Sequence, residues 1–79
     1  MTMITIKYRD YKRLVEKGAT KHLYNNKSDR AATIMYEGEI YSHELFANEH
    51  GWNWKQFAWG QEWYYKSESG KELLVEMRF

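Results

Sequence analysis

Three histidines, His22, His43 and His50, are the side chains of this sequence best suited to acid–base or metal chemistry. No two of them stand at the i, i+4 spacing with which a helix presents two imidazoles to zinc, and the chain has no cysteine to complete a thiolate site. General acid–base catalysis needs two groups within hydrogen-bond reach, which this spacing does not indicate. We therefore expect ordinary surface or half-buried histidines, no metal site and no cofactor.

The N-terminal half also contains a scatter of residue types of the kind that small ribonuclease toxins use. Its members are Arg9, Glu16, His22, Tyr24 and Arg30. Their spacing supports no site, and the chain has no glycine-rich loop for phosphate and no paired-carboxylate motif. We therefore expect a protein that is not an enzyme.

Three polar residues that lie close together in the second half of the chain are suited to recognition by hydrogen bonding. Asn53, Lys55 and Gln56 have side chains that reach base edges, with Gln suited to adenine and Lys to guanine. Lys66 and Lys71, farther along the chain, have the charge needed for phosphate contacts. Whether they act together depends on the elements that position them.

The segment 42–57 resembles the helix-turn-helix pattern. Ala47 is the small residue that the pattern needs inside the first helix, and Gly51, four residues later, is its turn. Trp52 and Phe57 are the two apolar residues that fix the second helix. The resemblance implies that residues 53–59 form a recognition helix for the major groove, with Asn53 at its N-terminal end.

The flanking segments extend this resemblance to winged helix-turn-helix domains. A leading helix over residues 10–17 would precede the helix pair, with Asp10 as its N-cap. A C-terminal hairpin of residues 62–66 and 72–78 would be the wing, with its tip at 67–70. In this arrangement Lys66 and Lys71 would touch phosphate.

The remaining elements follow from local patterns. Ile4, Ile6 and Tyr8 alternate with polar residues, which predicts a strand, and residues 19–31 are polar and aperiodic, which predicts a loop. A tight hairpin is predicted around Glu37 and Gly38, and Ser42 is a good N-cap for a helix over 43–49. We predict one α+β domain over residues 1–79, with short helices and antiparallel hairpins in winged-helix order.

Aromatic residues make up 18% of the chain, and all four tryptophans lie between residues 52 and 63. Trp52, Phe57 and Trp63 are expected in the core. Trp54 and Trp59 are five residues apart, so a helix cannot turn both inward. We expect at least one of these two to be exposed, where it would anchor a partner protein.

The formal net charge of +1 conceals an asymmetry. Residues 1–32 carry a net charge of +5 and residues 33–79 one of −4. A surface with two poles would follow, one suited to phosphates or an acidic protein, unless the two halves interleave in space. No segment is apolar enough to predict a membrane span or a secretory signal, so we expect cytoplasmic residence.

Two hypotheses about function remain. The first is a small nucleic-acid-binding protein that reads bases with Asn53, Lys55 and Gln56. The second is a phage- or plasmid-type inhibitor or adaptor that docks on a host protein through Trp54 and Trp59. Acidic residues around the helix-turn-helix segment favour the second, because phosphate neutralisation dominates DNA affinity.

Overall fold

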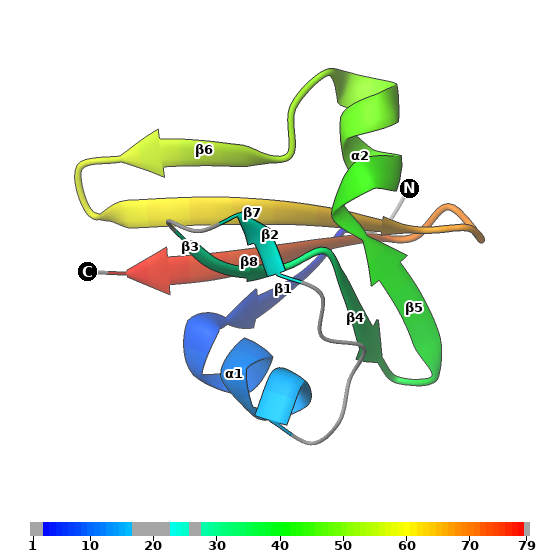
Figure 1. Cartoon of the computed structure of the whole chain (residues 1–79), viewed down its shortest axis with the longest axis horizontal. Helices are drawn as coiled ribbons and strands as arrows, with labels where there is room; N and C mark the ends of the chain where they lie inside the picture. Colours follow the sequence, from blue (N-terminus) through cyan, green and yellow to red (C-terminus); the bar gives the residue numbers. More distant parts are fainter. Residues whose placement is uncertain (1–2, 17–22, 26–27, 79) are drawn as a thin grey trace.

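A mixed β-sheet built around two long central strands organises the fold (Figure 1). The computed structural model describes the backbone of residues 3–16, 23–25 and 28–78 and the side chains of 3–14 and 31–78. Its helices are α1 (Tyr8–Glu16) and α2 (His43–His50). Its strands are β1 (Met3–Lys7), β2 (Leu23–Asn25), β3 (Ser28–Ala31), β4 (Thr33–Tyr36), β5 (Glu39–Ser42), β6 (Trp54–Phe57), β7 (Gly60–Ser67) and β8 (Glu72–Arg78).

The six-stranded sheet has the order β1-β8-β7-β5-β4, and β6 also pairs with β7. β1 runs parallel to β8, and the other pairs in this sheet are antiparallel. β6 pairs with the first half of β7, whereas β5 meets β7 only near its end, where Tyr41 faces Ser67 and Ser42 faces Lys66. The sheet therefore forks along β7, and α2 connects the two branches.

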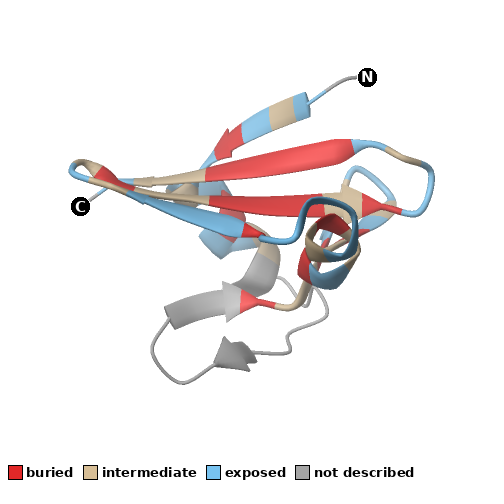
Figure 2. Ribbon diagram, turned by 90° about the horizontal axis from the view of Figure 1, so that it is seen from above, coloured by how far each residue is buried: buried red, intermediate tan, exposed pale blue. Residues whose placement is uncertain are grey.

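One face of the sheet forms the main core against α1. Tyr11 of α1 is 1% exposed and packs edge-on against Trp63 of β7, with ring centroids 5.2 Å apart. Leu73 and Val75 of β8 and Ile6 of β1 complete this layer. Figure 2 shows the buried residues running along the central strands, in contrast to the exposed β6.

The opposite face carries a second, smaller cluster of Phe46, Tyr64 and Leu74. Phe46 projects from α2 and stacks on Tyr64 with ring centroids 5.0 Å apart. Because side chains alternate between the two faces of a strand, consecutive buried residues such as Trp63, Tyr64 and Tyr65 require cover on both faces. The two helices therefore cover opposite faces of the sheet.

A buried hydrogen-bond network ties the end of β3 to the core. The Ala31 amide donates to the Tyr11 hydroxyl over 2.5 Å, and the Tyr65 hydroxyl donates to the Ala31 carbonyl over 2.7 Å. The two phenol oxygens are 3.3 Å apart. All three residues are at most 1% exposed, so the two phenols satisfy the backbone N–H and C=O of Ala31, which water does not reach.

Gly60, at the end of the β6–β7 hairpin, allows the backbones of β7 and β8 to approach closely. Its φ is +153°, and a Cβ atom there would lie 2.0 Å from the carbonyl oxygen of Met77. No side chain fits at that distance, so this position requires glycine.

The predicted α+β domain in winged-helix order is wrong, because the protein is mostly β-structure. Residues 54–57, expected within a recognition helix, form β6. Gly51 ends α2 in the left-handed conformation, with φ of 82°, and its amide donates to the Ala47 carbonyl. The chain then pairs with β7, which gives the aromatic residues Trp54 and Phe57 the strand environment they favour.

Two further corrections concern segments on either side. The C-terminal hairpin was expected as an exposed wing. Its two strands are β7 and β8, which form the buried centre of the sheet. Within the predicted loop over 19–31, the described residues include β2 and β3, which pair as a separate two-stranded sheet. The strand at Ile4 and Ile6, the hairpin at Glu37 and Gly38, and the Ser42 cap of α2 are confirmed. Tyr8, expected in that strand, begins α1, so Asp10 is not the N-cap of this helix.

Candidate functional site

Asn53, expected at the head of a recognition helix, is a structural residue. It is 7% exposed, and its side-chain amide donates to the His43 carbonyl over 3.4 Å. Its own carbonyl accepts from the Tyr64 amide over 2.8 Å. It therefore joins α2, β6 and β7 and presents no side chain to a ligand.

Lys55 and Gln56 are exposed on β6, but in different roles. The Lys55 ammonium lies 4.7 Å from the centroid of the Trp52 ring. The Gln56 side chain donates to the carbonyls of Phe57 and Gly60 and accepts from Gln61. Gln56 thus closes the β6–β7 hairpin, and only Lys55 of this pair is left to face a ligand.

Lys66 and Lys71 both form ion pairs. Lys66 pairs with Glu49, and its side chain is 16% exposed. The Lys71 ammonium lies 2.9 Å from Glu39. The three residues predicted on a recognition helix lie on or directly before β6, and the two lysines predicted on the wing form ion pairs, so most of the five are engaged within the protein.

The tryptophans divide differently from the prediction. Trp54 is 41% exposed, as expected for at least one of the pair, but Trp59 is half-buried and stacks on Phe57 with ring centroids 4.9 Å apart. Trp63 is in the core as predicted, whereas Trp52 is 37% exposed and contacts the sheet through Tyr64 and Lys55. The expectation that Trp52 lies in the core is wrong.

Among the three histidines and the scattered polar set, the structure describes the side chains of His43, His50 and Arg9. His43 is fully buried and stacks on Tyr65 at 4.1 Å, with a ring nitrogen 2.7 Å from the Tyr64 carbonyl oxygen. Arg9 is exposed on α1. His22 and the side chains of Glu16, Tyr24 and Arg30 lie outside the described residues.

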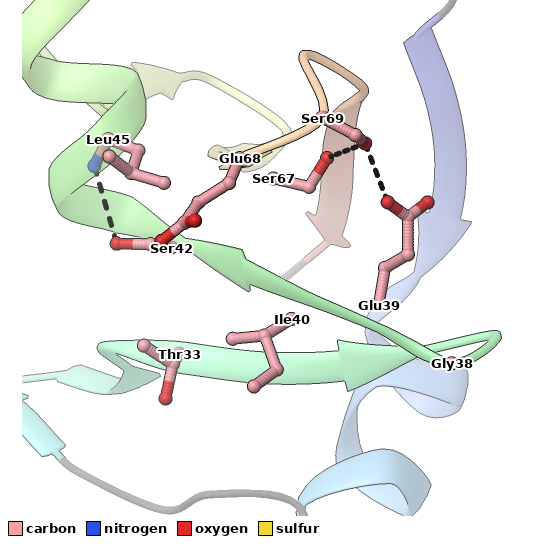
Figure 3. A pocket seen from close by; sticks show the side chains of 9 residues that line it. All are labelled: Thr33, Gly38, Glu39, Ile40, Ser42, Leu45, Ser67, Glu68 and Ser69. Carbon is pink, nitrogen blue, oxygen red and sulfur yellow. Dashed lines mark hydrogen bonds between the residues drawn. The ribbon is translucent and has the colours of Figure 1, made fainter.

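A hollow of about 520 Å³ lies between the β4–β5 hairpin, the start of α2 and the β7–β8 turn (Figure 3). It exists because β5 pairs with β7 at only two positions, so the first half of β5 stands away from the turn. Its lining residues are Thr33, Gly38, Glu39, Ile40, Ser42, Leu45, Ser67, Glu68 and Ser69.

Glu39 bridges the open side of this hollow. Its carboxylate accepts from the Ser69 hydroxyl over 2.6 Å and lies 2.9 Å from the Lys71 ammonium. The hydrogen bond from Ser69, followed by that from Lys71, holds the pKa of Glu39 below its ordinary value. The hydroxyls of Ser67 and Ser69 are 2.9 Å apart, so a row of polar groups lines this wall.

Two apolar side chains also line the hollow, and the hairpin carries a third apolar side chain nearby. Ile40, which lines the hollow, is 53% exposed, and its cross-strand partner Met35 is 45% exposed. Leu45 of α2, which also lines the hollow, is half-buried. We call Met35, Ile40, Leu45 and the adjoining hollow the hairpin surface.

Several carboxylates lie on the elements that form the hairpin surface. Glu37 at the hairpin tip, Glu44 on the first turn of α2 and Glu68, which lines the hollow, are exposed, whereas Glu39 is half-buried and paired with Lys71. An apolar centre with an acidic rim results. The sequence analysis missed this surface, although the two-residue turn at Glu37 and Gly38 already sets Met35 and Ile40 side by side.

The basic side of the charge asymmetry is visible on α1. Arg9, Lys12 and Arg13 are exposed, and none of them forms an ion pair with a described residue. Tyr11 and Leu14 turn the other side of the helix toward the core. The helix therefore presents a cationic outer face.

Comparison of the chain with models of protein families, with curated proteins and with solved structures finds no match. Among the described residues, neither helix has the length and apolar character needed to cross a membrane.

Proposed function

We propose that the protein is a non-catalytic binding domain that holds a partner protein on the hairpin surface. The observation that carries this proposal is the exposed cross-strand pair of Ile40, which lines the hollow, and Met35. Single exposed apolar residues are common, but adjacent ones that adjoin a hollow and are ringed by polar groups are typical of protein interfaces. Methionine adapts its shape to a partner at little cost.

The rim determines which partner fits. Glu37, Glu44 and Glu68 are exposed and form no ion pair with a described residue, whereas the charge of Glu39 is already paired with Lys71. Carboxylates around an apolar centre favour a partner segment that carries lysine or arginine next to an apolar side chain. We therefore propose a basic, partly apolar segment of another protein as the occupant.

Fluorescence anisotropy with short labelled peptides tests this proposal. One set places lysine or arginine on both sides of a leucine, isoleucine or phenylalanine, and a matched set places glutamate there. We expect the basic set to bind and the acidic set not to bind. Ile40→Thr keeps a β-branched side chain but removes apolar area, and we expect it to weaken binding at least about tenfold, as for an interface hot spot.

Trp54→Ser is the matched control, because it also removes an exposed apolar side chain but from β6. We expect it to leave peptide binding unchanged. Loss of binding in Trp54→Ser with Ile40→Thr unaffected would move the site to the predicted aromatic surface. Failure of every basic peptide to bind would refute the proposal. The assignment to a phage- or plasmid-type inhibitor or adaptor and the cytoplasmic location stay predictions.

Nucleic-acid binding is a second candidate, favoured by the exposed cations of α1. Arg9, Lys12 and Arg13 form a cationic helical face without an ion-pair partner among the described residues. Such a face suits phosphate contacts that do not depend on base sequence. This candidate uses α1 in place of the absent recognition helix.

Anisotropy of a labelled 20-nucleotide DNA, single-stranded and duplex, at low and moderate salt tests this second candidate. We expect binding that weakens as salt is added, with the salt slope reduced by about one for Lys12→Ala and for Arg13→Ala. Lys55→Ala on β6 is the control, and a larger loss in that variant would return the site to the predicted residue. Absence of binding at low salt would eliminate both versions.

A further inference from the structure

Four polar side chains converge where α2 ends beside β7 and β8, at a place that the hairpin surface does not include. Glu49 and His50 form the last turn of α2, Lys66 lies near the end of β7, and Glu72 begins β8 (Figure 1). Lys66 and Glu72 are cross-strand partners on one face of the sheet. Helix and sheet thus bring together residues that are distant in sequence.

The donor atoms of Glu49, His50 and Glu72 have the spacing of a metal coordination sphere. The Nε2 atom of His50 lies 3.3 Å from Glu72 Oε2 and 3.5 Å from Glu49 Oε1, and all three donors lie within 4.8 Å of one another. Ligands about 2.0–2.1 Å from a tetrahedral zinc ion are about 3.3–3.4 Å apart. The two distances from His50 therefore match two edges of such a tetrahedron.

The Nε2 atom of His50 is within hydrogen-bond distance of Glu72 Oε2 and makes an ion-pair contact with Glu49 Oε1. An imidazole nitrogen carries at most one hydrogen, so the two carboxylates must share it. Both distances also exceed the usual length of a charge-assisted hydrogen bond, which is about 2.7–2.9 Å. A cation between the three atoms would satisfy all of them together.

The ligands are held in place by their surroundings. The His50 ring stacks on Phe46 at 4.2 Å, and Phe46 is itself 2% exposed and packed on Tyr64. Glu72 is 8% exposed within the sheet. Ligands on rigid, packed elements lose little freedom on binding a metal.

Lys66 supports the site without blocking it. It pairs with Oε2 of Glu49, whereas Oε1 of the same carboxylate faces His50. The lysine therefore orients the carboxylate and leaves one oxygen for a metal, in the manner of outer-shell partners at known sites. With two carboxylates and one ammonium, the cluster carries a net charge of −1 when His50 is neutral.

We infer that Glu49, His50 and Glu72 bind a divalent transition-metal ion of the zinc class. One nitrogen and two oxygen donors suit zinc, and three protein ligands leave a fourth position open. The side chains of Glu49 and His50 are 44% and 35% exposed, so water reaches that position. This inference does not rest on the proposed function.

Isothermal titration of the tag-free protein with ZnCl₂ tests the inference, and Co²⁺ absorption reports the geometry. We expect one ion per chain and the intense visible bands of four-coordinate Co²⁺. His50→Gln and Glu72→Gln should each lower the zinc affinity more than about 100-fold, beyond the loss caused by an outer-shell partner. Far-UV circular dichroism confirms that each variant is folded, and His50→Gln, at a partly exposed position, keeps the test decisive if Glu72→Gln unfolds.

Glu44→Gln is the matched control, since it removes an exposed carboxylate from the same helix. We expect it to leave zinc affinity unchanged. Amide chemical shifts should move around residues 49, 50 and 72 when zinc is added. Absence of binding at millimolar zinc, full affinity in His50→Gln, or an equal loss in Glu44→Gln would each overturn the inference.

Discussion

Replacing Tyr65 by phenylalanine removes one hydroxyl from the buried network and leaves the ring in place. The hydroxyl donates to the Ala31 carbonyl over 2.7 Å, and both residues are fully buried. The variant keeps the stacking on His43 but leaves a buried acceptor without this donor. A buried polar group deprived of its partner costs about 1–3 kcal/mol, so we expect a loss of that size in the free energy of unfolding.

Tyr11 bonds the other backbone group of the same residue, because its hydroxyl accepts from the Ala31 amide. Tyr11→Phe should therefore destabilise by a similar amount. The two phenol oxygens are 3.3 Å apart, so the stability lost in the double variant should differ from the sum of the losses in the two single variants. Residues within one network couple by about 0.5–3 kcal/mol.

Urea unfolding followed by tryptophan fluorescence measures these changes, with thermal unfolding as a second readout. A domain of this size loses about 4–8 °C in Tm for each kcal/mol. Tyr8→Phe is the matched control, because Tyr8 is half-buried and its hydroxyl makes no hydrogen bond to a described residue. A Tyr65→Phe variant as stable as Tyr8→Phe would refute the role assigned to the network.

Two further predictions follow from Gly60 and Glu39. Gly60→Ala should prevent folding or lower the free energy of unfolding by more than about 3 kcal/mol, because its Cβ has no space against β8. Gly70→Ala, where φ is +95° and no atom lies near the Cβ position, should cost only about 1–2 kcal/mol. Equal unfolding midpoints in urea for the two variants would contradict this prediction. The pKa of Glu39 is lowered by Ser69 and Lys71, so its contribution to stability is present above the ordinary value of 4.5 and is lost as the pH falls through the lower, folded-state value. Glu39→Gln should therefore show a smaller decrease in stability between pH 7 and acid than the unaltered protein, and identical pH profiles would count against the bridge.

The elements that local chemistry determines were predictable from the sequence. Ser42 caps α2 with its own side chain, and Gly51 ends the helix because it adopts the left-handed conformation at little cost. The hairpin at Glu37 and Gly38 likewise depends on a positive φ at two consecutive residues. Each of these signals acts over a few residues, so no knowledge of the rest of the fold is needed.

β6 could not be predicted in the same way. Short segments such as 53–59 satisfy both a helix and a strand, and the choice is made by pairing with β7. The resemblance to a helix-turn-helix identified the glycine turn correctly but assigned the wrong element after it. Exposure of at least one of Trp54 and Trp59 was predicted, and the exposed residue, Trp54, lies on a strand instead of a helix.

The candidate sites were hidden because they depend on the sheet. His50 and Glu72 are 22 residues apart, and only the path of α2 beside β8 brings them together. The hollow arises from the divergence of β5 and β7, which no local pattern records. Sequence periodicity predicts which face of a helix or strand a residue lies on. It does not predict which residue of another element that side chain will contact.

The parallel pairing of β1 with β8 has a consequence for how the chain reaches its native state. Lys7 and Glu76, which form an ion pair across these strands, are separated by 69 positions in the chain. Nearly the whole polypeptide must be synthesised before the first strand finds its neighbour, and closing so large a loop is entropically costly. Folding should therefore finish late and slowly for so short a chain, with the hairpins formed first and the N-terminal strand added last.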